Sequence, residues 1–366
     1  MKIVGSRSFM LRVPINSEIA DSMQSVTSLE FVGLTLATDA GISGTGYTVT
    51  VGHGGSVIRE VLDSLFREEL MGEDPHNVRG IWQKLYFGKS HWIGRAGATS
   101  MAQAAVDIAL WDIKAKAAGQ PLWQLLGGAR PVTIPAYNTH AGWLNYSIDQ
   151  LQDEALRLLG QGYTALKMKV GLADSRADYE RVKAVRRAIG DGALLMVDAN
   201  QRWDAVQART TAAMLEELRL AWIEEPLHPD DVPAHRTLKQ YISTPIALGE
   251  HVYSTHAFRD FMAAGAVDIV QVDVCRVGGV TPWLEVAALA HAHGLRVSPH
   301  CGDLMQVHQH LVRAIPNSWH LEVIPLWEVG PFEHQSRLER GSCLTPTEPG
   351  ASTDFTALAM DKFRVG

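Results

Sequence analysis

Short apolar runs alternate with amphipathic helical segments from Val132 to Val323, and this alternation constrains the fold more than any other feature of the chain. Each run has the length and composition of a strand that is buried on both faces. We predict strands at residues 132–137, 165–170, 194–199, 222–225, 246–250, 269–273, 296–300 and 320–323. A strand–helix unit repeated in this way predicts a (β/α) barrel. A doubly wound open sheet is the alternative, but it favours a glycine-rich turn after the first strand, and Tyr137-Asn138-Thr139-His140 is not one.

Two of the intervening helices have recognisable ends. The first carries an apolar face from Tyr179 to Ile189, with Ser175 as the predicted N-cap and Gly190 as the residue that stops it. The second is predicted to open with Thr281-Pro282, a capping residue followed by a first-turn proline, and to end at Gly294.

The first 127 residues have a different pattern, which is typical of an α+β domain. Strands are predicted at residues 2–14, 28–39 and 47–51, with a polar loop at residues 16–27. A helix begins near Ser56, and a second apolar helical stripe runs from Val106 to Ala117. Residues 125–129 are predicted to form the boundary between this domain and the barrel. We therefore expect an α+β capping domain at residues 1–127, a barrel at residues 128–330, and a final segment, residues 331–366, that folds back to complete the cap.

Composition excludes several classes of protein. Apolar residues make up 46% of the chain and charged residues 20%, which is ordinary for a soluble enzyme. The net charge of −7 and the absence of a Lys/Arg run argue against nucleic acid as a partner. Three cysteines without a CxxC motif fit a reducing compartment. We find neither a signal peptide nor a membrane span, and so expect a cytoplasmic protein.

Ionisable side chains stand at the ends of seven consecutive predicted strands. The active site of such barrels lies at the carboxyl ends of the strands. The groups in strand order are Lys167 and Lys169, Asp198, Glu224, Glu250, Asp273, His300 and Glu322. One acid at a strand end is more often a helix cap or a surface group. Seven in succession would be costly to bury without partners, which favours a functional site.

Three carboxylates on adjacent strands, those of Asp198, Glu224 and Glu250, repel one another unless a cation lies between them. Ligands that are all oxygen favour Mg²⁺, with Mn²⁺ as a substitute, over Zn²⁺. Such a metal keeps positions for substrate oxygens, so we expect a small-molecule carboxylate as the partner.

Other strand-end groups flank this predicted metal site. Lys169 and His300 come from opposite sides and can reach opposite faces of a substrate. Asp273 is placed to orient the imidazole of His300. Neighbouring positive charge from Lys167 and the metal would lower the pKa of Lys169. We expect the remaining residues to contact substrate: Lys167 its carboxylate, Asn200 and His53 through hydrogen bonds, and Glu322, if protonated, as a donor to an enolate oxygen.

Together these motifs resemble the enolase superfamily, and within it the mandelate racemase subgroup. The resemblance rests on the 105–112 helix with Leu125-Leu126-Gly127-Gly128, Lys167-Met168-Lys169, Val197-Asp198-Ala199-Asn200, Ile223-Glu224-Glu225-Pro226, Gly249-Glu250, Asp273 with Arg276-Val277-Gly278-Gly279, His300 and Glu322. It implies a capping α+β domain over a modified (β/α)7β barrel and Mg²⁺ on the three carboxylates.

The resemblance also implies a reaction. The proton α to a carboxylate is abstracted to give a metal-stabilised enediolate, with Lys169 and the His300–Asp273 dyad as acid/base groups. Cap loops, here about residues 16–27 and 47–55, contact the distal part of the substrate. Relatives are commonly dimer-based octamers, so we expect a homo-oligomer.

Several outcomes can follow that first step. Loss of a β-hydroxyl makes the enzyme a dehydratase that gives a 2-keto-3-deoxy acid, whereas reprotonation on the other face makes it a racemase or epimerase. The polar side chains of the first cap loop and His53 favour a polyhydroxylated substrate, an aldonate or aldarate. These loop residues are Ser17, Glu18, Asp21, Ser22, Gln24 and Ser25. We therefore predict a sugar-acid dehydratase. A catalytically silent binding barrel is a third reading, but such a protein would be expected to lack a ligand or a base, and none is missing.

Overall fold

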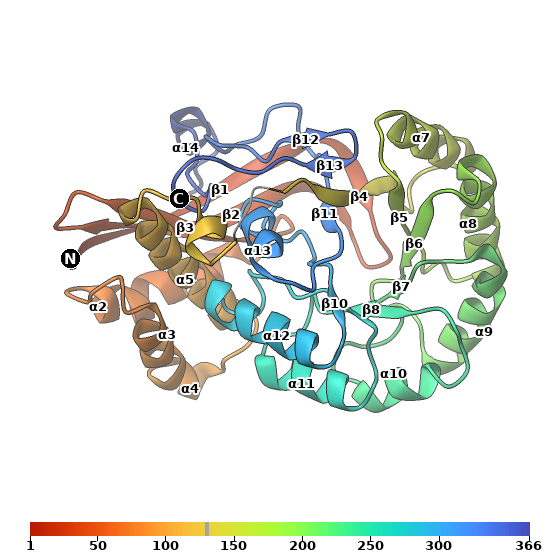
Figure 1. Ribbon diagram of the computed structural model, residues 1–366, viewed down its shortest axis with the longest axis horizontal. Coiled ribbons are helices and arrows are strands. Elements are labelled where there is room, and N and C mark those ends of the chain that lie inside the picture. The colour runs from red at the N-terminus through yellow and green to blue at the C-terminus, as the bar shows by residue number, and fades with distance from the viewer. Residues whose placement is uncertain (129–131) are drawn as a thin grey trace.

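A parallel barrel forms the larger part of the molecule. The computed structural model describes residues 1–128 and 132–366 (Figure 1). Its parallel strands are β4 (Ile134–Gly142), β5 (Ala165–Lys169), β6 (Leu194–Asp198), β7 (Ile223–Glu224), β8 (Ile246–Leu248), β9 (Ile269–Val270), β10 (Arg296–Val297) and β11 (Leu321–Val323). They pair in sequence order from β4 to β10, and β11 pairs with β4. A bridge between Val297 and Ser318 closes the ring.

One helix follows each barrel strand except the last, among the residues described. These helices are α7 (Ile148–Gly160), α8 (Ser175–Ile189), α9 (Ala205–Leu215), α10 (Val232–Leu238), α11 (Thr255–Ala263), α12 (Val280–Ala292) and α13 (His308–Ala314), and a 3₁₀ turn, η2 (Glu216–Leu218), continues α9. The predicted (β/α)7β barrel is thus confirmed. The observed strands are mostly shorter than predicted, although hydrogen bonds to the neighbouring strand continue past several strand ends, as from the Ala199 N–H to the Glu224 carbonyl.

Two predicted helix caps are wrong by one or two residues. Asp174, not Ser175, caps α8 by accepting a hydrogen bond from the Arg176 N–H. Helix α12 begins at Val280 after Gly279, so Thr281 and Pro282 lie inside its first turn.

The N-terminal part contains a three-stranded antiparallel sheet in the order β1 (Ile3–Ala20), β2 (Ser25–Thr38) and β3 (Ser43–Thr50). The predicted loop at residues 16–27 is wrong, because the β1–β2 hairpin continues through it and only a short turn separates the strands. Ile19 pairs with Val26, and both side chains are buried, which holds the hairpin together. The polar residues between them conceal this apolar pair in the sequence.

Helix α5 (Ala98–Ala117) packs on this sheet. Gly46 of β3 permits the close approach, since a Cβ there would lie 2.0 Å from the Ala105 carbonyl oxygen. The other helices of this part are α1 (Gly55–Glu60), the π-helix η1 (Val61–Phe66), α2 (Arg67–Leu70), α3 (Val78–Phe87), α4 (Ser90–Ile93) and α6 (Leu122–Leu125). Within the described ranges, no helix has both the length and the apolar character needed to cross a membrane.

The last segment of the chain returns to the N-terminal sheet. Phe332 and Phe355 pack against Phe31 of β2, and Leu11 pairs with Arg364. This segment contains β12 (Leu338–Glu339), β13 (Ser342–Cys343) and α14 (Ala357–Lys362), which Figure 1 shows beside the N-terminal strands. Since β13 also pairs with β4, the segment contacts the barrel as well. The division into residues 1–127 with 331–366 and residues 128–330 stays a prediction, and Ala129 of the predicted boundary lies outside the described residues.

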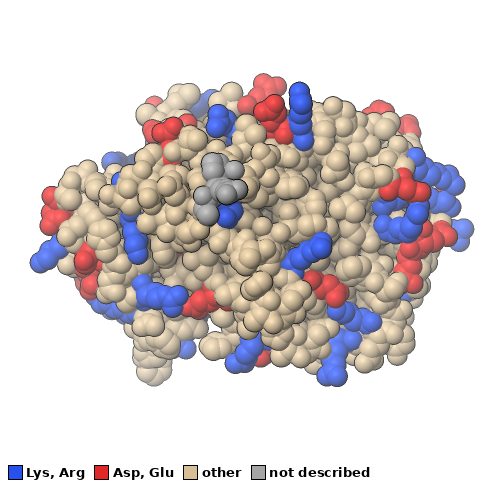
Figure 2. Space-filling view, in the orientation of Figure 1, with Lys and Arg blue, Asp and Glu red and all other residues tan. Residues whose placement is uncertain are grey.

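Charged side chains of both signs are interspersed over the visible face of the molecule (Figure 2). The described part of that face carries no broad field of one sign. Such a distribution does not attract a polyanion to this face.

One buried acid connects the two parts of the fold. Asp107 of α5 accepts hydrogen bonds from the Thr281 N–H at 2.9 Å and from the Thr281 hydroxyl at 2.6 Å. We expect Asp107→Ala to lower the free energy of unfolding by about 1–3 kcal/mol, because two buried donors lose their acceptor. Urea unfolding measures the loss. Asp107→Asn keeps an acceptor oxygen and should lose less; equal stability of the wild type and the Ala variant would contradict this account.

Candidate active site

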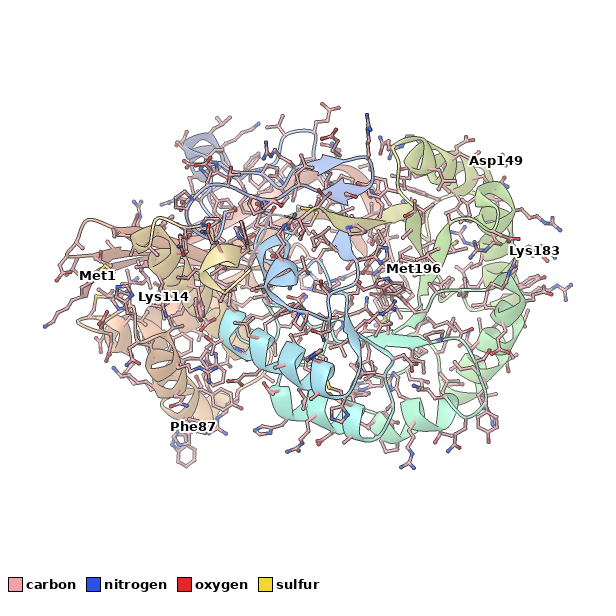
Figure 3. All side chains as sticks on the ribbon, viewed as in Figure 1. Met1, Phe87, Lys114, Asp149, Lys183 and Met196 are labelled. Atoms are coloured by element: carbon pink, nitrogen blue, oxygen red, sulfur yellow. The ribbon has the colours of Figure 1, made fainter. Side chains whose placement is uncertain are left out.

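Three buried carboxylates meet at the carboxyl end of the barrel. Asp198 and Glu224 are the last residues of β6 and β7 and pair with each other in register, and Glu250 lies two residues beyond β8. One oxygen from each lies within 4.8 Å of the others. Met196, labelled inside the barrel in Figure 3, precedes Asp198 by two residues, so strand alternation directs both side chains inward. The sequence prediction that these acids converge is confirmed as geometry.

The local electrostatics of this cluster fit a hard cation. Burial, and then the nearby Asp198 carboxylate, raise the pKa of Glu224 well above its usual value. Gln271 and the Trp222 indole N–H donate to Glu224 Oε2, whereas Glu250 Oε2 is buried with His300 Nε2 3.1 Å away but makes no hydrogen bond. A divalent cation among these oxygens would offset their repulsion and give Glu250 Oε2 a partner.

The two lysines of β5 point into the barrel, but at different depths. Lys169 Nζ lies 2.5 Å from Asp198 Oδ2, and the side chain lines a cavity above the carboxylates. Lys167 Nζ lies 2.6 Å from Glu224 and 2.7 Å from Glu322 and has no exposed surface. Lys167 does not line the cavity, so the expected contact between Lys167 and the substrate carboxylate is not supported by its position.

Carboxylates dominate the electrostatics of Lys169 in this structure. Burial would lower the pKa of Lys169, but Asp198, Glu250 and Glu224 together outweigh burial and raise that pKa above its usual value. The lowering expected from the sequence applied to a site that holds a metal ion beside Lys169. Lys167 does act to lower the pKa of Lys169, as expected, but its effect is smaller than that of Asp198.

His300 lies on the other side of the carboxylate cluster. Its Nδ1 is 2.6 Å from Asp273 Oδ2 and its Nε2 is 3.1 Å from Glu250 Oε2. Burial lowers the pKa of His300, but the two carboxylates outweigh it and raise that pKa to about 9. The predicted contact between His300 and Asp273 is therefore present in the structure.

Glu322 is held as an anion. It accepts hydrogen bonds from the Thr139 hydroxyl and from the Cys301 N–H, at 2.5 and 3.0 Å. Burial would raise the pKa of Glu322, but Lys167, His300 and the hydrogen bond from Thr139 together outweigh burial and lower that pKa to about 2. The structure therefore argues against the protonated Glu322 that was proposed as a donor to an enolate oxygen.

Asn200 and Glu225 adopt left-handed backbone conformations directly above the site, with φ of 44° and 38°. Such conformations are costly outside glycine and gather at functional sites. The Asn200 N–H donates to Asp198 Oδ1, and its buried side-chain oxygen has no hydrogen-bond partner. Asn200 and His53 both line the cavity, as a contact with substrate requires.

Sequence reasoning missed a second polar group beside the cluster. His251 Nδ1 lies 3.1 Å from Glu225 and 3.3 Å from Glu250, and Gln201 Nε2 donates to Glu225 at 2.9 Å. Each of these residues directly follows a residue that was singled out, which was the available indication. Arg276 was also missed, although it lines the cavity and belongs to a quoted motif.

A cavity of about 560 Å³ lies between the N-terminal sheet and the barrel mouth. The polar cap residues that were expected to contact substrate line it only in part. Asp21, Gln24 and His53 do so, whereas Ser22 donates to the Ala199 carbonyl. Ser17, Glu18 and Ser25 are not among its lining residues, because the hairpin turns them away.

The site consists of three buried acids at the mouth of a (β/α)7β barrel, with a lysine on one side and a histidine on the other. Two known protein families match the chain that carries it. The profile described as "Mandelate racemase / muconate lactonizing enzyme, N-terminal domain" matches residues 6–127, and the one described as "Enolase C-terminal domain-like" matches residues 150–358. The chain belongs to the enolase superfamily, in its mandelate racemase subgroup.

Several proteins similar to this chain have names that identify them as enzymes of sugar acids. The chain is 35% identical over 363 residues to the 3,6-anhydro-alpha-L-galactonate cycloisomerase of Streptomyces coelicolor, covering 98% of this chain and 99% of that one. It is 38% identical over 305 residues to the L-talarate/galactarate dehydratase of Salmonella typhimurium, covering 82% and 74%. The structure of that dehydratase with Mg and L-lyxarohydroxamate superposes with a TM-score of 0.92 at 32% identity, covering 100% of this chain and 93% of that one.

Proposed function

We propose that this protein is a Mg²⁺-dependent dehydratase of a sugar acid, an aldonate or aldarate. The observation that carries the proposal is the convergence of Asp198, Glu224 and Glu250 between Lys169 and His300. The sugar-acid dehydratases and the cycloisomerase among its relatives support this class of substrate.

Asp198, Glu224 and Glu250 would hold Mg²⁺, for which Mn²⁺ is a substitute. When bound, the ion supplies positive charge that offsets the negative charge a substrate carboxylate gains as its α-proton leaves. Lys169, beside Asp198, and His300, beside Glu250, would then face the α-carbon from opposite sides.

Proton transfer is assigned to these two side chains. With the charge of Asp198 and Glu250 offset by the bound ion, the pKa of Lys169 and of His300 would fall. One of the two side chains then takes the α-proton, and the electrons of the broken C–H bond form a carbon–carbon double bond as the β-hydroxyl departs. His300 gives a proton to that hydroxyl, so water leaves, and the resulting enol becomes the 2-keto-3-deoxy acid. Asp273 holds the imidazole in one tautomer. Asn200 and His53 are proposed substrate contacts, while Lys167 and Glu322 position the carboxylates beneath.

Racemisation or epimerisation of an α-hydroxy acid is the second candidate function. Two proton-transfer groups on opposite faces also permit reprotonation without loss of hydroxide. A silent binding barrel is disfavoured because each predicted ligand and base is present and oriented toward the site.

We further propose a homo-oligomer, dimer-based and up to an octamer. Phe87, Trp92 and Ile93 of α3 and α4 are 64%, 85% and 57% exposed, and Phe87 projects from the molecule in Figure 3. Contacts between copies would cover these apolar groups. Light scattering measures the mass of the oligomer.

The free, buried cysteines Cys275, Cys301 and Cys343 support the proposal of a reducing, cytoplasmic location. Cell fractionation tests this location.

Turnover of an acid library tests the function. We expect at least one aldonate or aldarate, supplied with Mg²⁺, to give a keto acid that semicarbazide detects. Inversion at the α-carbon without keto-acid formation would favour the racemase instead. Failure of every acid in both assays would contradict the proposal.

A further inference from the structure

The cap side of the active-site cavity is largely apolar. Ile19, Met23, Val26, Leu29, Val49 and Val51 line it from the β1–β2 hairpin and β3. Val26, Leu29 and Val49 belong to a hydrophobic cluster that continues into the barrel loops. The part of a substrate farthest from the carboxylates therefore meets side chains that cannot donate or accept hydrogen bonds.

Polar side chains on this wall are mostly occupied within the protein. Asp21 Oδ1 accepts from the N–H groups of Met23 and Gln24, and the Thr50 hydroxyl donates to Glu30. Among the described lining residues of the cap, Gln24 and His53 are the ones whose polar side chains have no intramolecular hydrogen bond. Two such groups can satisfy only part of a fully hydroxylated carbon chain.

The cations of the cavity all come from the barrel. Lys169 pairs with Asp198, whereas the Nε of Arg276 is buried without a hydrogen-bond partner. Within the described chain, no Lys or Arg of the N-terminal part lines the cavity, and Asp21 adds an acid there. A second carboxylate at the distal end of a substrate, against the cap, would lose water without gaining a counter-ion from the cap, which is costly.

We propose that the substrate is a monocarboxylic sugar acid whose distal end is uncharged and poor in hydroxyl groups, such as a deoxy- or anhydroaldonate, rather than an aldarate. This inference rests on the proposed dehydratase function. An apolar wall discriminates by about 10- to 200-fold for small differences in substrate structure, and burial of a charge adds to this.

Matched acids test the inference. For each configuration that shows turnover, kcat/KM is measured for the aldarate, the aldonate and the 6-deoxyaldonate of one carbon skeleton. We expect the 6-deoxyaldonate to exceed the aldarate by at least about tenfold. An aldarate that equals or exceeds it would overturn the inference and leave the dehydratase intact. Turnover of none of the acids would instead contradict the proposed function itself.

A charge introduced into the wall provides an independent test. Met23 is 63% exposed, so Met23→Lys should fold normally. We expect this variant to raise kcat/KM for the aldarate by about tenfold, whereas the uncharged control Met23→Gln should not. An unchanged value in Met23→Lys would overturn the electrostatic part of the inference. Arg276→Met tests whether Arg276 could act as the counter-ion instead. If the wild type prefers aldarates and Arg276→Met loses aldarate turnover alone, Arg276 is the counter-ion and the inference is overturned as well.

Discussion

Replacing Lys169 by alanine is expected to lower kcat/KM for the true sugar acid by about 10²- to 10⁴-fold, the range that a positioned acid or base contributes. The Lys169 ammonium lies 2.5 Å from Asp198 and lines the cavity, so its removal leaves one face of the α-carbon without a proton-transfer group. Steady-state kinetics with keto-acid detection measures the loss.

Lys183 provides the matched control. It projects outward from α8 on the surface of the barrel (Figure 3), and Lys183→Ala should leave kcat/KM unchanged. Lys169→Ala also removes the closer of the two ion pairs of Asp198 and leaves the one with Lys167 at 3.6 Å. A thermal melt of this variant, and of Lys169→Met, which retains more of the side-chain volume, shows whether the protein is folded. Activity of a folded Lys169 variant within threefold of the wild type would contradict the role assigned to Lys169.

His300→Asn should cause a loss of similar size, since His300 faces the cluster from the opposite side. Exchange of the substrate α-hydrogen in D₂O distinguishes the Lys169 variant from the His300 variant. The variant that keeps the initiating base should still exchange the α-hydrogen of the acid without forming product, and the other should not. Proton NMR follows the exchange. Keto-acid formation by both variants at the rate of the wild type would exclude this pair of groups.

The second large effect concerns the metal. Chelation with EDTA is expected to abolish keto-acid formation, and added Mg²⁺ should restore it, since three buried carboxylates without a cation repel one another. Glu250→Gln should weaken Mg²⁺ binding by at least about 100-fold, because it removes one of the three charged ligands of the cluster. Calorimetric titration measures the affinity.

An exposed glutamate on the barrel serves as the control for this variant. Glu180 of α8 lies away from the cluster, so Glu180→Gln should bind Mg²⁺ like the wild type. Unchanged Mg²⁺ affinity in Glu250→Gln, or full activity after exhaustive chelation, would contradict the metal assignment.

Sequence reasoning succeeded where a short-range pattern determines the geometry. In a parallel barrel every strand runs in one direction, so groups at strand ends must meet at one mouth. Asp198, Glu224 and Glu250 could therefore be brought together without knowledge of the packing, and so could Lys169 and His300. The (β/α) barrel followed from the same alternation, and its (β/α)7β form from the resemblance to the enolase superfamily.

Other features depend on contacts that no local pattern encodes. Alternation placed Lys167 and Lys169 on one face but could not show that Lys167 lies deeper, closed off by Glu224 and Glu322. The tip of the β1–β2 hairpin, residues 16–27, was predicted to be a loop because polar residues surround the pair of Ile19 and Val26. For that reason the apolar cap wall was also missed, and the polarity of the cap was overestimated.

The most direct test of the account follows the α-proton in the double variant Lys169→Ala/His300→Asn. The wild type with Mg²⁺ in D₂O should convert the acid to a 2-keto-3-deoxy acid, seen by proton NMR as loss of the α-hydrogen signal. The folded double variant, which retains Asp198, Glu224 and Glu250, should still bind Mg²⁺ but neither exchange the α-hydrogen nor form the keto acid. Exchange or keto-acid formation by the double variant at a rate near that of the wild type would contradict the account.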